Sequence, residues 1–491
     1  MKTIVVIGAG ASCDFRRKAE HSPGGFKIEE KEVGFPTGEA LVERMIGFEK
    51  NDLIQKGGLK SYLELLASEH EEFFQNPQER QKFVNNNHDL TGDGNSDANT
   101  FFKNFIHPKY NGTWYVGENE DQIFAAAGKK AKELHEAIKI TAPKTIAAKL
   151  GFTAHVNLAK LLKFYNPSSI DNFLTSIERE LIDISVCDNK ESKENLVKAG
   201  KELIAYYILK AENKNIFDAS YKIWYRWFRE AIINSYANKS FNEAKKKKPA
   251  KIIAETIDRL QIINFNYDRS LMHFLDVKMP KFSGEIKEKI FCPYGSLGGK
   301  NKLKKKGDIF KSAWESKGLE YEYGKLADDL KERGLKEIFD DTISKMAKNI
   351  YVIGELERRV PQNKKTDKLE KEFQQKILNS ASPKNKQKIY FLGFGFIEDN
   401  LFRAFGAEEI PIGSADNGLS YQGSKLWPSR EIFYTNFDNH QKIEKIINRF
   451  FNGDKGFGSP DEDERIRKNF VFTKSTIGLY DALERDFPLI I

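Results

Sequence analysis

The chain has 491 residues, and 79 Lys and Arg against 71 Asp and Glu leave a formal net charge of +8 at pH 7. A chain of this length forms two or three domains, or one α/β domain with large insertions. It can form a stable hydrophobic core without disulfide bonds. Charged residues make up 31% of the sequence, so this small excess of cations argues only weakly for an anionic partner and leaves nucleic-acid binding undecided.

The three cysteines, Cys13, Cys187 and Cys292, lie far apart and form no CxxC pair. This spacing excludes a disulfide framework and a four-cysteine zinc ribbon, so we expect no metal site. Free cysteines favour a reducing compartment, and we expect a cytoplasmic protein. No apolar run approaches the ~18 residues of a membrane span, so no membrane partner is expected.

Short runs of apolar and β-branched residues predict strands that are buried on both faces of a sheet. The first run is Thr3–Ile7, and the later ones span residues 260–263, 350–353, 389–392 and 432–434. Helical or turn patterns flank the later runs, which is typical of strands joined by helical crossovers. We therefore predict an α/β fold with a Rossmann-like, doubly wound, mostly parallel sheet.

A large insertion separates the first two predicted strands, because one crossover needs far fewer residues than 8–259. Apolar residues three and four apart predict helices there, over residues 121–142, 155–164, 169–184 and 217–237. We therefore divide the chain into an α/β core at 1–50 and 255–491 and a mainly helical inserted subdomain at 51–254. The aromatic cluster Trp224, Tyr225, Trp227 and Phe228 indicates either a helical core, which we favour, or an oligomer face.

Gly8-Ala9-Gly10-Ala11-Ser12 directly follows the first predicted strand. Glycines at positions 8 and 10 let backbone N–H groups approach a phosphate closely, and the start of a helix favours negative charge there. The full dinucleotide fingerprint is absent, because Cys13 stands where its third glycine would be. The motif is therefore either an anion cradle or a purely structural strand-to-helix turn.

Asn266 and Asp268 lie in the segment Asn264-Phe265-Asn266-Tyr267-Asp268, directly after the predicted strand at 260–263. In an open α/β sheet, ligands bind beyond the carboxyl ends of the strands, so both side chains are candidates for a site. The alternative is that both residues cap the next helix, since Asn and Asp are preferred at that position.

Two further segments follow short apolar runs in the same way. One is Cys292-Pro293-Tyr294-Gly295-Ser296, and the other is Gly393-Phe394-Gly395 with Asp399 and Asn400 behind it. Glycines after a strand permit close approach to a ribose or a phosphate. Each segment alone is compatible with turn chemistry, but four such segments at the carboxyl ends of strands indicate a bound ligand.

The order of these motifs resembles the sirtuin-like family. GAGAS is followed by Gly34-Phe35-Pro36, by NFNYD in place of a Thr-Gln-Asn-x-Asp segment, by CPYGS in place of a His-Gly segment, and by the Gly-x-Gly pattern of GFGF. The resemblance covers the stretches 1–50 and 255–445. The helical insertion and the segments 432–436 and 475–487 are similar to the prokaryotic sirtuin-like proteins of anti-phage defence and not to the deacylases.

The resemblance implies an NAD+ pocket and cleavage of the nicotinamide–ribose bond to nicotinamide and ADP-ribose. It implies that residues 8–12 cradle the diphosphate, that Asn266 contacts the nicotinamide ribose and positions water, and that Asp268 holds the nicotinamide end. The candidates for lining the rest of the pocket are Phe35, Pro36, Gly295, Ser296, Gly393, Phe394, Gly395, Asp399 and Asn400. Such a cleavage develops positive charge on the ribose, so the site needs polar groups around it and room for one water.

Two departures from the family pattern bear on the reaction. The deacylases hold a structural zinc on two CxxC pairs, which are absent here, so deacylation is disfavoured. The family's histidine base falls near Cys292 or Tyr294, and thiols and phenols are poorer bases than imidazole at neutral pH. Cys292 and Tyr294 therefore join Asn266 and Asp268 as catalytic candidates. Alternative sources of an imidazole are His107, His155 and His273.

The first hypothesis is an NAD+ hydrolase that acts as a regulated anti-phage, abortive-infection effector in the cytoplasm. The resemblance implies control by a homo-oligomer or by a partner ATPase or nuclease. The alternative is a non-catalytic NAD+ or ADP-ribose sensor or scaffold, which the replaced histidine favours. A third hypothesis assigns nucleic-acid binding to the lysine runs at 245–248 and 302–306, which are otherwise expected to be solvated loops.

Overall fold

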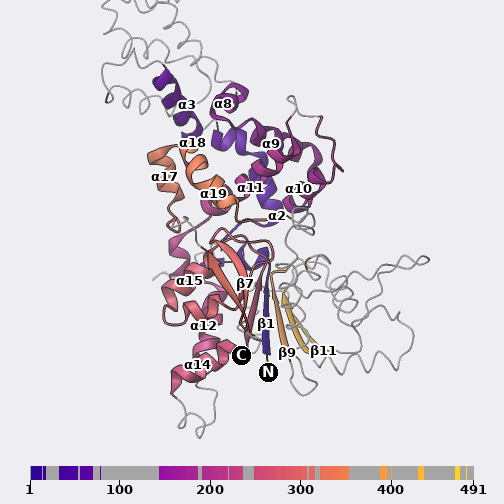
Figure 1. Ribbon diagram of the computed structural model, residues 1–491, viewed down its shortest axis with the longest axis vertical. Coiled ribbons are helices and arrows are strands. Elements are labelled where there is room, and N and C mark those ends of the chain that lie inside the picture. Colours follow the sequence, from indigo (N-terminus) through magenta and orange to yellow (C-terminus); the bar gives the residue numbers. More distant parts are fainter. Residues whose placement is uncertain are drawn as a thin grey trace, which may run out of the picture. The chain divides into compact units, whose positions relative to one another are not determined.

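The computed structural model describes residues 2–13, 15–17, 32–53, 56–69, 78, 143–185, 191–218, 220–235, 248–306, 309–315, 321–352, 387–394, 400, 430–435, 470–475 and 483 (Figure 1). The chain divides into two compact units. The sheet unit comprises Met1–Thr37, Ala211–Tyr323 and Asn349–Ile491, and the helical unit comprises Gly38–Lys210 and Gly324–Lys348. The division that the sequence suggests stays a prediction.

Six strands of the sheet unit form one sheet in the order β11-β10-β9-β1-β5-β6 (Figure 1). Their bounds are β1 Lys2–Ile7, β5 Leu260–Asn264, β6 Ile290–Phe291, β9 Gln387–Leu392, β10 Arg430–Thr435 and β11 Phe470–Ser475. Every neighbouring pair is parallel. This arrangement confirms the predicted α/β class with a parallel sheet.

β1 is the central strand of this group, because it pairs with β5 on one side and with β9 on the other. Its residues Ile4–Ile7 are at most 3% exposed, as expected of a continuous apolar run that is covered on both faces. In register, Ile7 lies beside Asn264 of β5 and Leu392 of β9. The carboxyl ends of these three strands therefore share one edge of the sheet, where the segments that follow them begin.

Four predicted strands are confirmed, at residues 3–7, 260–263, 389–392 and 432–434. The prediction at 350–353 is wrong for its described part, because Ile350 forms an isolated antiparallel bridge with Gly295 and residues 351–352 are not in a strand. Ile350 and Val352 are fully buried. The run is therefore apolar because it packs into the core, and not because it joins the sheet.

The sheet unit also holds helices, a small antiparallel sheet and a β-hairpin. The helices are α1 Ala9–Cys13, η4 Lys214–Phe217, α12 Trp224–Asn234, α14 Pro249–Asp258, α15 Ser270–Lys278 and α16 Ser283–Lys287. The small sheet pairs β2 Phe15–Arg17 with β3 Glu32–Val33 and β4 Tyr221–Lys222, and the hairpin pairs β7 Lys300–Lys306 with β8 Ile309–Glu315. The lysine run at 302–306 thus lies in a strand, which corrects its interpretation as a loop.

The aromatic cluster of α12 lies in a packed core. Trp224, Tyr225, Trp227 and Phe228 are each at most 4% exposed. The ring of Tyr225 meets that of Phe15 edge-on, with 5.5 Å between the centroids. This burial confirms the core interpretation and removes the cluster as an argument for an oligomer face.

The helical unit is built around α11. Its elements are α2 Gly38–Ile46, η1 Glu49–Leu53, α3 Lys56–Glu69, α8 Pro143–Leu150, α9 Thr153–Tyr165, α10 Ile170–Glu178, α11 Lys193–Lys210, α17 Leu326–Arg333, α18 Leu335–Ile338, η5 Phe339–Ile343 and α19 Ser344–Ala347. α11 packs against α2, α9, α10 and α19. The buried carboxylate of Asp52 accepts hydrogen bonds from the hydroxyls of Tyr206 and Tyr207, each at 2.7 Å.

Three predicted helices fall wholly or partly within the described residues. The one at 155–164 is confirmed as α9. α10 ends at Glu178, short of the predicted 184, and Glu180 adopts the left-handed φ of +59° that a helix cannot continue through. The helix predicted at 217–237 begins only at Trp224, because β4 occupies part of its first turns. The helix predicted at 121–142 lies outside the described residues.

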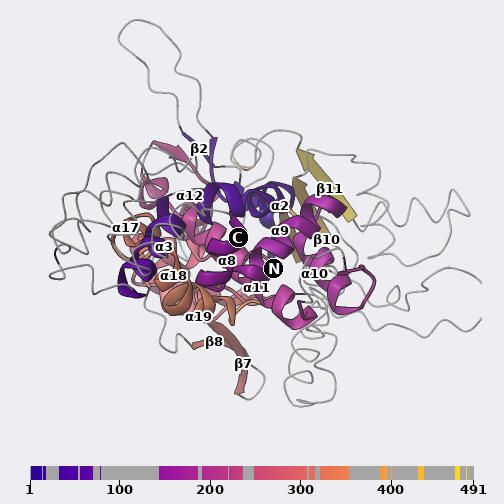
Figure 2. The same cartoon turned by 90° about the horizontal axis from the view of Figure 1, so that it is seen from above.

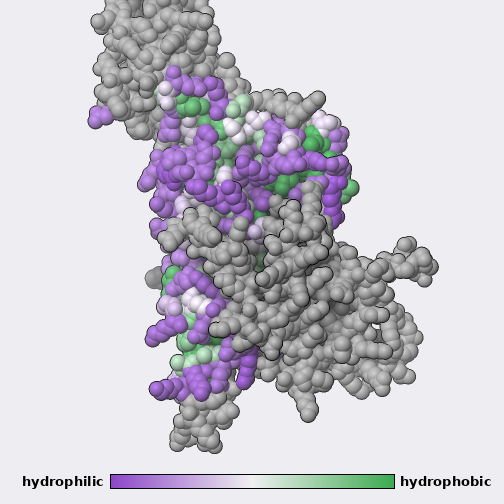
Figure 3. All heavy atoms as spheres, viewed as in Figure 1, coloured by the Kyte–Doolittle hydropathy of each residue, from purple (hydrophilic) through white to green (hydrophobic). Residues whose placement is uncertain are grey.

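No helix in the described part of the chain is long and apolar enough to cross a membrane. On the face shown in Figure 3, the described residues are mainly hydrophilic, with smaller hydrophobic areas between them. Among the residues whose side chains are described, the large hydrophobic ones that are exposed are Phe164, Tyr165, Leu181, Ile233 and Val277.

Candidate functional site

The turn between β1 and α1 is in direct backbone contact with the end of β9. The N–H groups of Gly8 and Gly10 donate to the carbonyls of Leu392 at 2.9 Å and Gly393 at 3.0 Å, and the N–H of Ala11 donates to Gly8 at 2.9 Å. A Cβ at Gly8 would lie 2.5 Å from the Gly393 oxygen, and one at Gly393 would lie 2.0 Å from the Ala11 nitrogen.

Gly8, Gly10 and Gly393 therefore serve a close approach of two backbone segments, which favours the structural interpretation of these glycines. The three N–H groups named above already have acceptors within the protein. A diphosphate bound at this edge would need other donors than these, although the resemblance assigns it to residues 8–12.

Asn266 follows β5 and reaches across to the first motif. Its side-chain Nδ2 donates to Ser12 Oγ at 2.8 Å, and its backbone N–H donates to Asn264 Oδ1 at 3.1 Å. Its Oδ1 is buried and has no hydrogen-bond partner among the described residues. A buried acceptor without a partner costs about 1–3 kcal/mol, so this atom marks a position where a water or a ligand group would be stabilising.

Asp268 is fully buried on the same loop. Its Oδ1 accepts hydrogen bonds from the backbone N–H of Ser270, at 3.0 Å, and from the Ser270 hydroxyl. Burial raises the pKa of the Asp268 carboxyl, and hydrogen bonds from Ser270, Ser12 and Asn266 oppose that rise in part. The N-cap of α15 is Arg269, which makes no side-chain cap, and Asp268 accepts from the first helical N–H from the position before the cap. The hydrogen bonds of Asp268 place its carboxylate beside Asn266 and Ser12.

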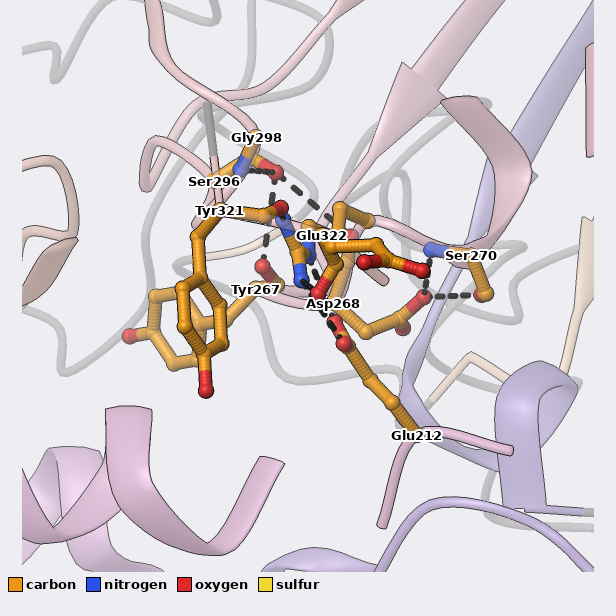
Figure 4. Close-up of polar contacts among 9 residues, drawn as sticks. Glu212, Tyr267, Asp268, Ser270, Ser296, Gly298, Tyr321 and Glu322 are labelled. Carbon is orange, nitrogen blue, oxygen red and sulfur yellow. Dashed lines mark hydrogen bonds and ion pairs between the residues drawn. The ribbon is translucent and has the colours of Figure 1, made fainter. Parts of the chain in front are cut away.

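Arg269 ties this loop to two other parts of the sheet unit. Its guanidinium binds the Glu212 carboxylate through Nε–Oε1 at 2.6 Å and Nη2–Oε2 at 2.8 Å. It also donates to the carbonyls of Tyr321 and Glu322, the latter at 3.0 Å. Figure 4 shows Glu212, Tyr321 and Glu322 converging on the loop that carries Tyr267 and Asp268. The buried cation therefore holds the loop in one conformation.

The CPYGS segment forms a tight turn beside the same loop. Gly295 has a φ of +77°, and a Cβ there would lie 1.9 Å from the Asn349 oxygen, so glycine is required. Leu297 N–H donates to the Tyr267 carbonyl at 2.8 Å, and Ser296 Oγ donates to the same carbonyl at 3.3 Å. The second and third motifs are therefore side by side, and Figure 4 shows Ser296 next to Tyr267.

Neither Cys292 nor Tyr294 is placed to accept a proton as the family's histidine would. Burial raises the pKa of the Cys292 thiol, and the nearby Asp268 charge raises it further, so the thiol stays protonated. The Tyr294 hydroxyl donates its proton in a hydrogen bond of 2.5 Å to Asn400 Oδ1. This bond favours the protonated form of the phenol. Both side chains are buried.

The remaining candidates divide between this edge and the part of the chain that is not described. Phe35 N–H donates to the Ser12 carbonyl at 3.0 Å, which brings the GFP motif against the β1–α1 turn. The ring of Phe394 lies 5.2 Å from that of Phe265. Pro36 follows Phe35 and is half-buried. Gly395 and Asp399 lie outside the described residues.

The described histidines have structural partners. His273 stacks on Tyr323 with 4.3 Å between ring centroids, and burial followed by the Arg269 charge lowers its pKa. His155 belongs to the helical unit, where its Nε2 lies 2.9 Å from Glu202. His107 is outside the described residues. Among the described residues, no group of three His, Cys, Asp or Glu side chains is placed to hold a metal ion.

Sequence patterns do not mark Arg269, Glu212, Tyr225 or Ser270 as residues of the site. The Tyr225 hydroxyl lies 2.6 Å from Ser270 Oγ, so it extends the polar cluster around Asp268. The one available signal is the position of Arg269 and Ser270 directly after Asp268. Nothing near Glu212 or Tyr225 in the sequence marks them as members.

No protein-family model, curated protein or solved structure matches this chain significantly.

Proposed function

We propose that the chain binds NAD+ at the carboxyl edge of its parallel sheet and hydrolyses the nicotinamide–ribose bond. The observation that carries the proposal is the buried, unpartnered Oδ1 of Asn266, next to Ser12 and Asp268. An acceptor at this position suits a ribose hydroxyl or the attacking water. The motif order that resembles sirtuin-like proteins supports the choice of NAD+.

The strand order supports a dinucleotide as the ligand. Numbered along the chain, the six strands of the sheet lie in the order 3-2-1-4-5-6. This is the order of Rossmann-like, doubly wound folds, in which a dinucleotide binds where the winding direction changes. That change occurs between β1 and β9, and residues 8–12 follow the first of these two strands. We therefore assign the fold to the Rossmann-like class.

Hydrolysis of the nicotinamide–ribose bond does not require a strong general base. When the nicotinamide leaves, the ribose becomes positively charged, and a weak nucleophile such as water suffices to trap it. The carboxylate of Asp268, when ionised, stabilises this charge, and Asn266 fixes the position of the hydroxyl or water. Loss of the family's histidine at Cys292 or Tyr294 is compatible with such a mechanism.

A second candidate is a sensor or scaffold that binds NAD+ or ADP-ribose without cleaving it. The protonated thiol of Cys292 and the engaged hydroxyl of Tyr294 favour this candidate, because no base stands in the family's position. A role as a cytoplasmic defence effector, a homo-oligomer and a partner ATPase or nuclease rest on the resemblance alone.

The test is nicotinamide release from NAD+ by the purified full chain, measured over a range of protein concentrations. Asn266→Ala removes the orphan acceptor, and Asn172→Ala changes an exposed asparagine of α10 as the matched control. Release by the wild type and by Asn172→Ala, with at least a ~100-fold loss in Asn266→Ala, supports the hydrolase. Calorimetric NAD+ binding without release supports the sensor. Absence of both binding and release contradicts both candidates.

A further inference from the structure

Tyr225 of α12 places a hydroxyl group in the interior of the sheet unit, beside the polar cluster around Asp268. The residue is 1% exposed. Figure 2 shows α12 next to β2, and the rings of Phe15 from β2 and Phe274 from α15 lie 5.5 and 5.3 Å from the Tyr225 ring. Because close-packed rings of this kind hold one another in place, the position of the hydroxyl is fixed by the core.

A chain of hydrogen bonds leads from Tyr225 to Asp268, and the carboxylate fixes its direction. Ser270 donates to Asp268 Oδ1 through its backbone N–H, at 3.0 Å, and through its hydroxyl (Figure 4). An ionised carboxylate can only accept, so the one proton of the Ser270 hydroxyl goes to it. The Tyr225 hydroxyl, 2.6 Å from Ser270 Oγ, is therefore the donor in that pair.

The Tyr225 hydroxyl also meets the part of the cluster that holds Asn266. Burial raises the pKa of this phenol, the Asp268 charge raises it further, and hydrogen bonds with Ser270 and Ser12 oppose the rise in part. The phenol therefore keeps its proton. The Ser12 hydroxyl in turn accepts from Asn266 Nδ2 at 2.8 Å. One tyrosine hydroxyl thus connects the two side chains to which we assign the water and the ribose charge.

We propose that Tyr225 is a positioning residue, which holds the Asp268 carboxylate ionised and in place through Ser270. Its role in a reaction rests on the proposed NAD+ hydrolysis, whereas the hydrogen-bond chain does not. A donor that polarises the Ser270 hydroxyl strengthens the bond from that hydroxyl to Asp268. Hydrogen bonds to the charged form of a carboxyl favour that form, whereas burial opposes it. The phenol therefore helps to keep a negative charge available for the ribose cation.

Cys292 and Tyr323 are further titratable groups that face Asp268. Burial raises the pKa of the Cys292 thiol and of the Tyr323 hydroxyl, and the Asp268 charge adds to each rise, so both stay protonated. Arg269, the cation on the same loop, is paired with Glu212. Comparison with Asp268→Asn at each pH separates the titration of Asp268 from that of these neighbours.

The first measurement needs no NAD+. The free energy of unfolding in urea is compared between the wild type and Asp268→Asn, and between Tyr225→Phe and Tyr225→Phe/Asp268→Asn, from pH 4 to pH 9. The contribution of Asp268 is present below its unfolded pKa and is lost as the pH rises through its raised folded pKa. Without the phenol donor this pKa rises further, so we expect the loss to occur at higher pH. Loss at the same pH in both backgrounds overturns the proposal, whether or not the chain cleaves NAD+.

The second measurement follows nicotinamide release from NAD+ by the full chain. Because the ionised carboxylate is the active form, we expect the acid limb of the kcat/KM profile to move to higher pH in Tyr225→Phe. We expect kcat to fall about tenfold at pH 7 and KM to stay within about twofold, because the phenol supports a charged group but does not touch the substrate. In Ser270→Ala, which breaks the chain, addition of Tyr225→Phe should have no further effect.

Tyr207→Phe is the matched control. The Tyr207 hydroxyl also donates to a buried carboxylate, that of Asp52 at 2.7 Å, but in the helical unit. This variant should lose stability and keep the kcat and the pH profile of the wild type. Equal kinetic changes in Tyr207→Phe and Tyr225→Phe, or full activity of Tyr225→Phe at every pH, overturn the proposal. A wild type that releases no nicotinamide contradicts the proposed function, and the unfolding measurement then still decides whether Tyr225 acts on Asp268.

Discussion

The Arg269 guanidinium and the Glu212 carboxylate form a buried, two-pronged ion pair, with Nε–Oε1 at 2.6 Å and Nη2–Oε2 at 2.8 Å. Glu212 lies just after Lys210, where the chain enters the sheet unit from the helical unit. Tyr321 and Glu322, whose carbonyls also bind Arg269, lie just before the chain leaves the sheet unit again. One side chain on the Asp268 loop therefore anchors two of the points at which the chain passes between the units.

We expect Arg269→Gln to be strongly destabilising. The Glu212 side chain is 1% exposed, so loss of its cation leaves a buried, unpaired carboxylate, which costs about 3–5 kcal/mol. The free energy of unfolding in urea measures the effect. The double variant Arg269→Gln/Glu212→Gln removes both charges and should recover part of the loss.

The control for this ion pair is Arg333→Gln in α17. Arg333 binds Glu337 and Asp341, each at 2.7 Å, but its side chain is 30% exposed. Solvent screens such a pair, so we expect a loss below about 1 kcal/mol. Equal losses in Arg269→Gln and Arg333→Gln would contradict the importance that we assign to burial.

Asp268 should make the stability depend on pH in the direction opposite to that of most aspartates. Burial raises its folded-state pKa above the unfolded value, so the folded chain binds more protons between the two values. Its contribution is therefore fully present below the unfolded pKa and is lost as the pH rises through the folded pKa. We expect the stability of the wild type relative to Asp268→Asn to increase as the pH falls from 7 to 4, measured by urea unfolding.

Asp183 is the control with the opposite sign. Hydrogen bonds from Ser185 lower its pKa, so any contribution is present above the unfolded pKa and lost as the pH falls through the folded one. Because Asp183 is fully exposed, we expect the wild type to change little relative to Asp183→Asn. If the free energies of unfolding of the wild type and Asp268→Asn differ by the same amount at every pH from 7 to 4, the prediction is wrong. The folded chain would then tolerate protonated and ionised Asp268 equally.

The parts of the fold that follow from local chemistry could be predicted from the sequence. Ile4–Ile7 are apolar without interruption, as expected because β1 is buried on both faces, and polar residues directly after the strands indicated the edge where Ser12 and Asn266 meet. The continuous run at 350–353 misleads, because Ile350 and Val352 are buried by packing without joining the parallel sheet. Burial alone produces the same continuous apolar pattern in a strand of the sheet and in a packed segment outside it.

Contacts between distant residues could not be predicted in this way. Arg269 and Glu212 are 57 residues apart, and neither the charge nor the neighbours of Glu212 mark it as buried. The lysines at 302–306 resemble a solvated loop in composition, and only the pairing with β8 shows that they lie in a strand. Such features depend on which segments the fold brings together.

Cys292 should be among the least reactive thiols of the chain. Burial raises its pKa, so the thiolate that alkylating agents require is scarce at pH 8. We expect iodoacetamide to modify Cys292 at least ~100-fold more slowly in the folded chain than in urea, with half-buried Cys13 reacting before Cys292, as mass spectrometry can measure. Cys292→Ala should retain any NAD+ cleavage. Loss of cleavage in a stably folded Cys292→Ala would restore Cys292 as a catalytic group.

Gly393→Ala tests whether the glycine motifs serve the backbone or a ligand. Gly393 has a φ of +54°, and a Cβ there would lie 2.0 Å from the Ala11 nitrogen and 2.3 Å from the Gly10 carbonyl carbon. The left-handed conformation alone costs about 1 kcal/mol, and the collision with fixed backbone adds to it. We expect a loss above about 3 kcal/mol in the free energy of unfolding.

Gly284→Ala is the matched control, because a Cβ at this α16 residue meets nothing within 4 Å. Alanine in a helix is better than glycine by about 0.5–1 kcal/mol, so this variant should be neutral or slightly stabilised. If Gly393→Ala instead keeps the stability of the wild type and loses only NAD+ binding, then the glycine is there to admit the ligand. The contact between the β1–α1 turn and β9 would then be loose enough to open around a dinucleotide.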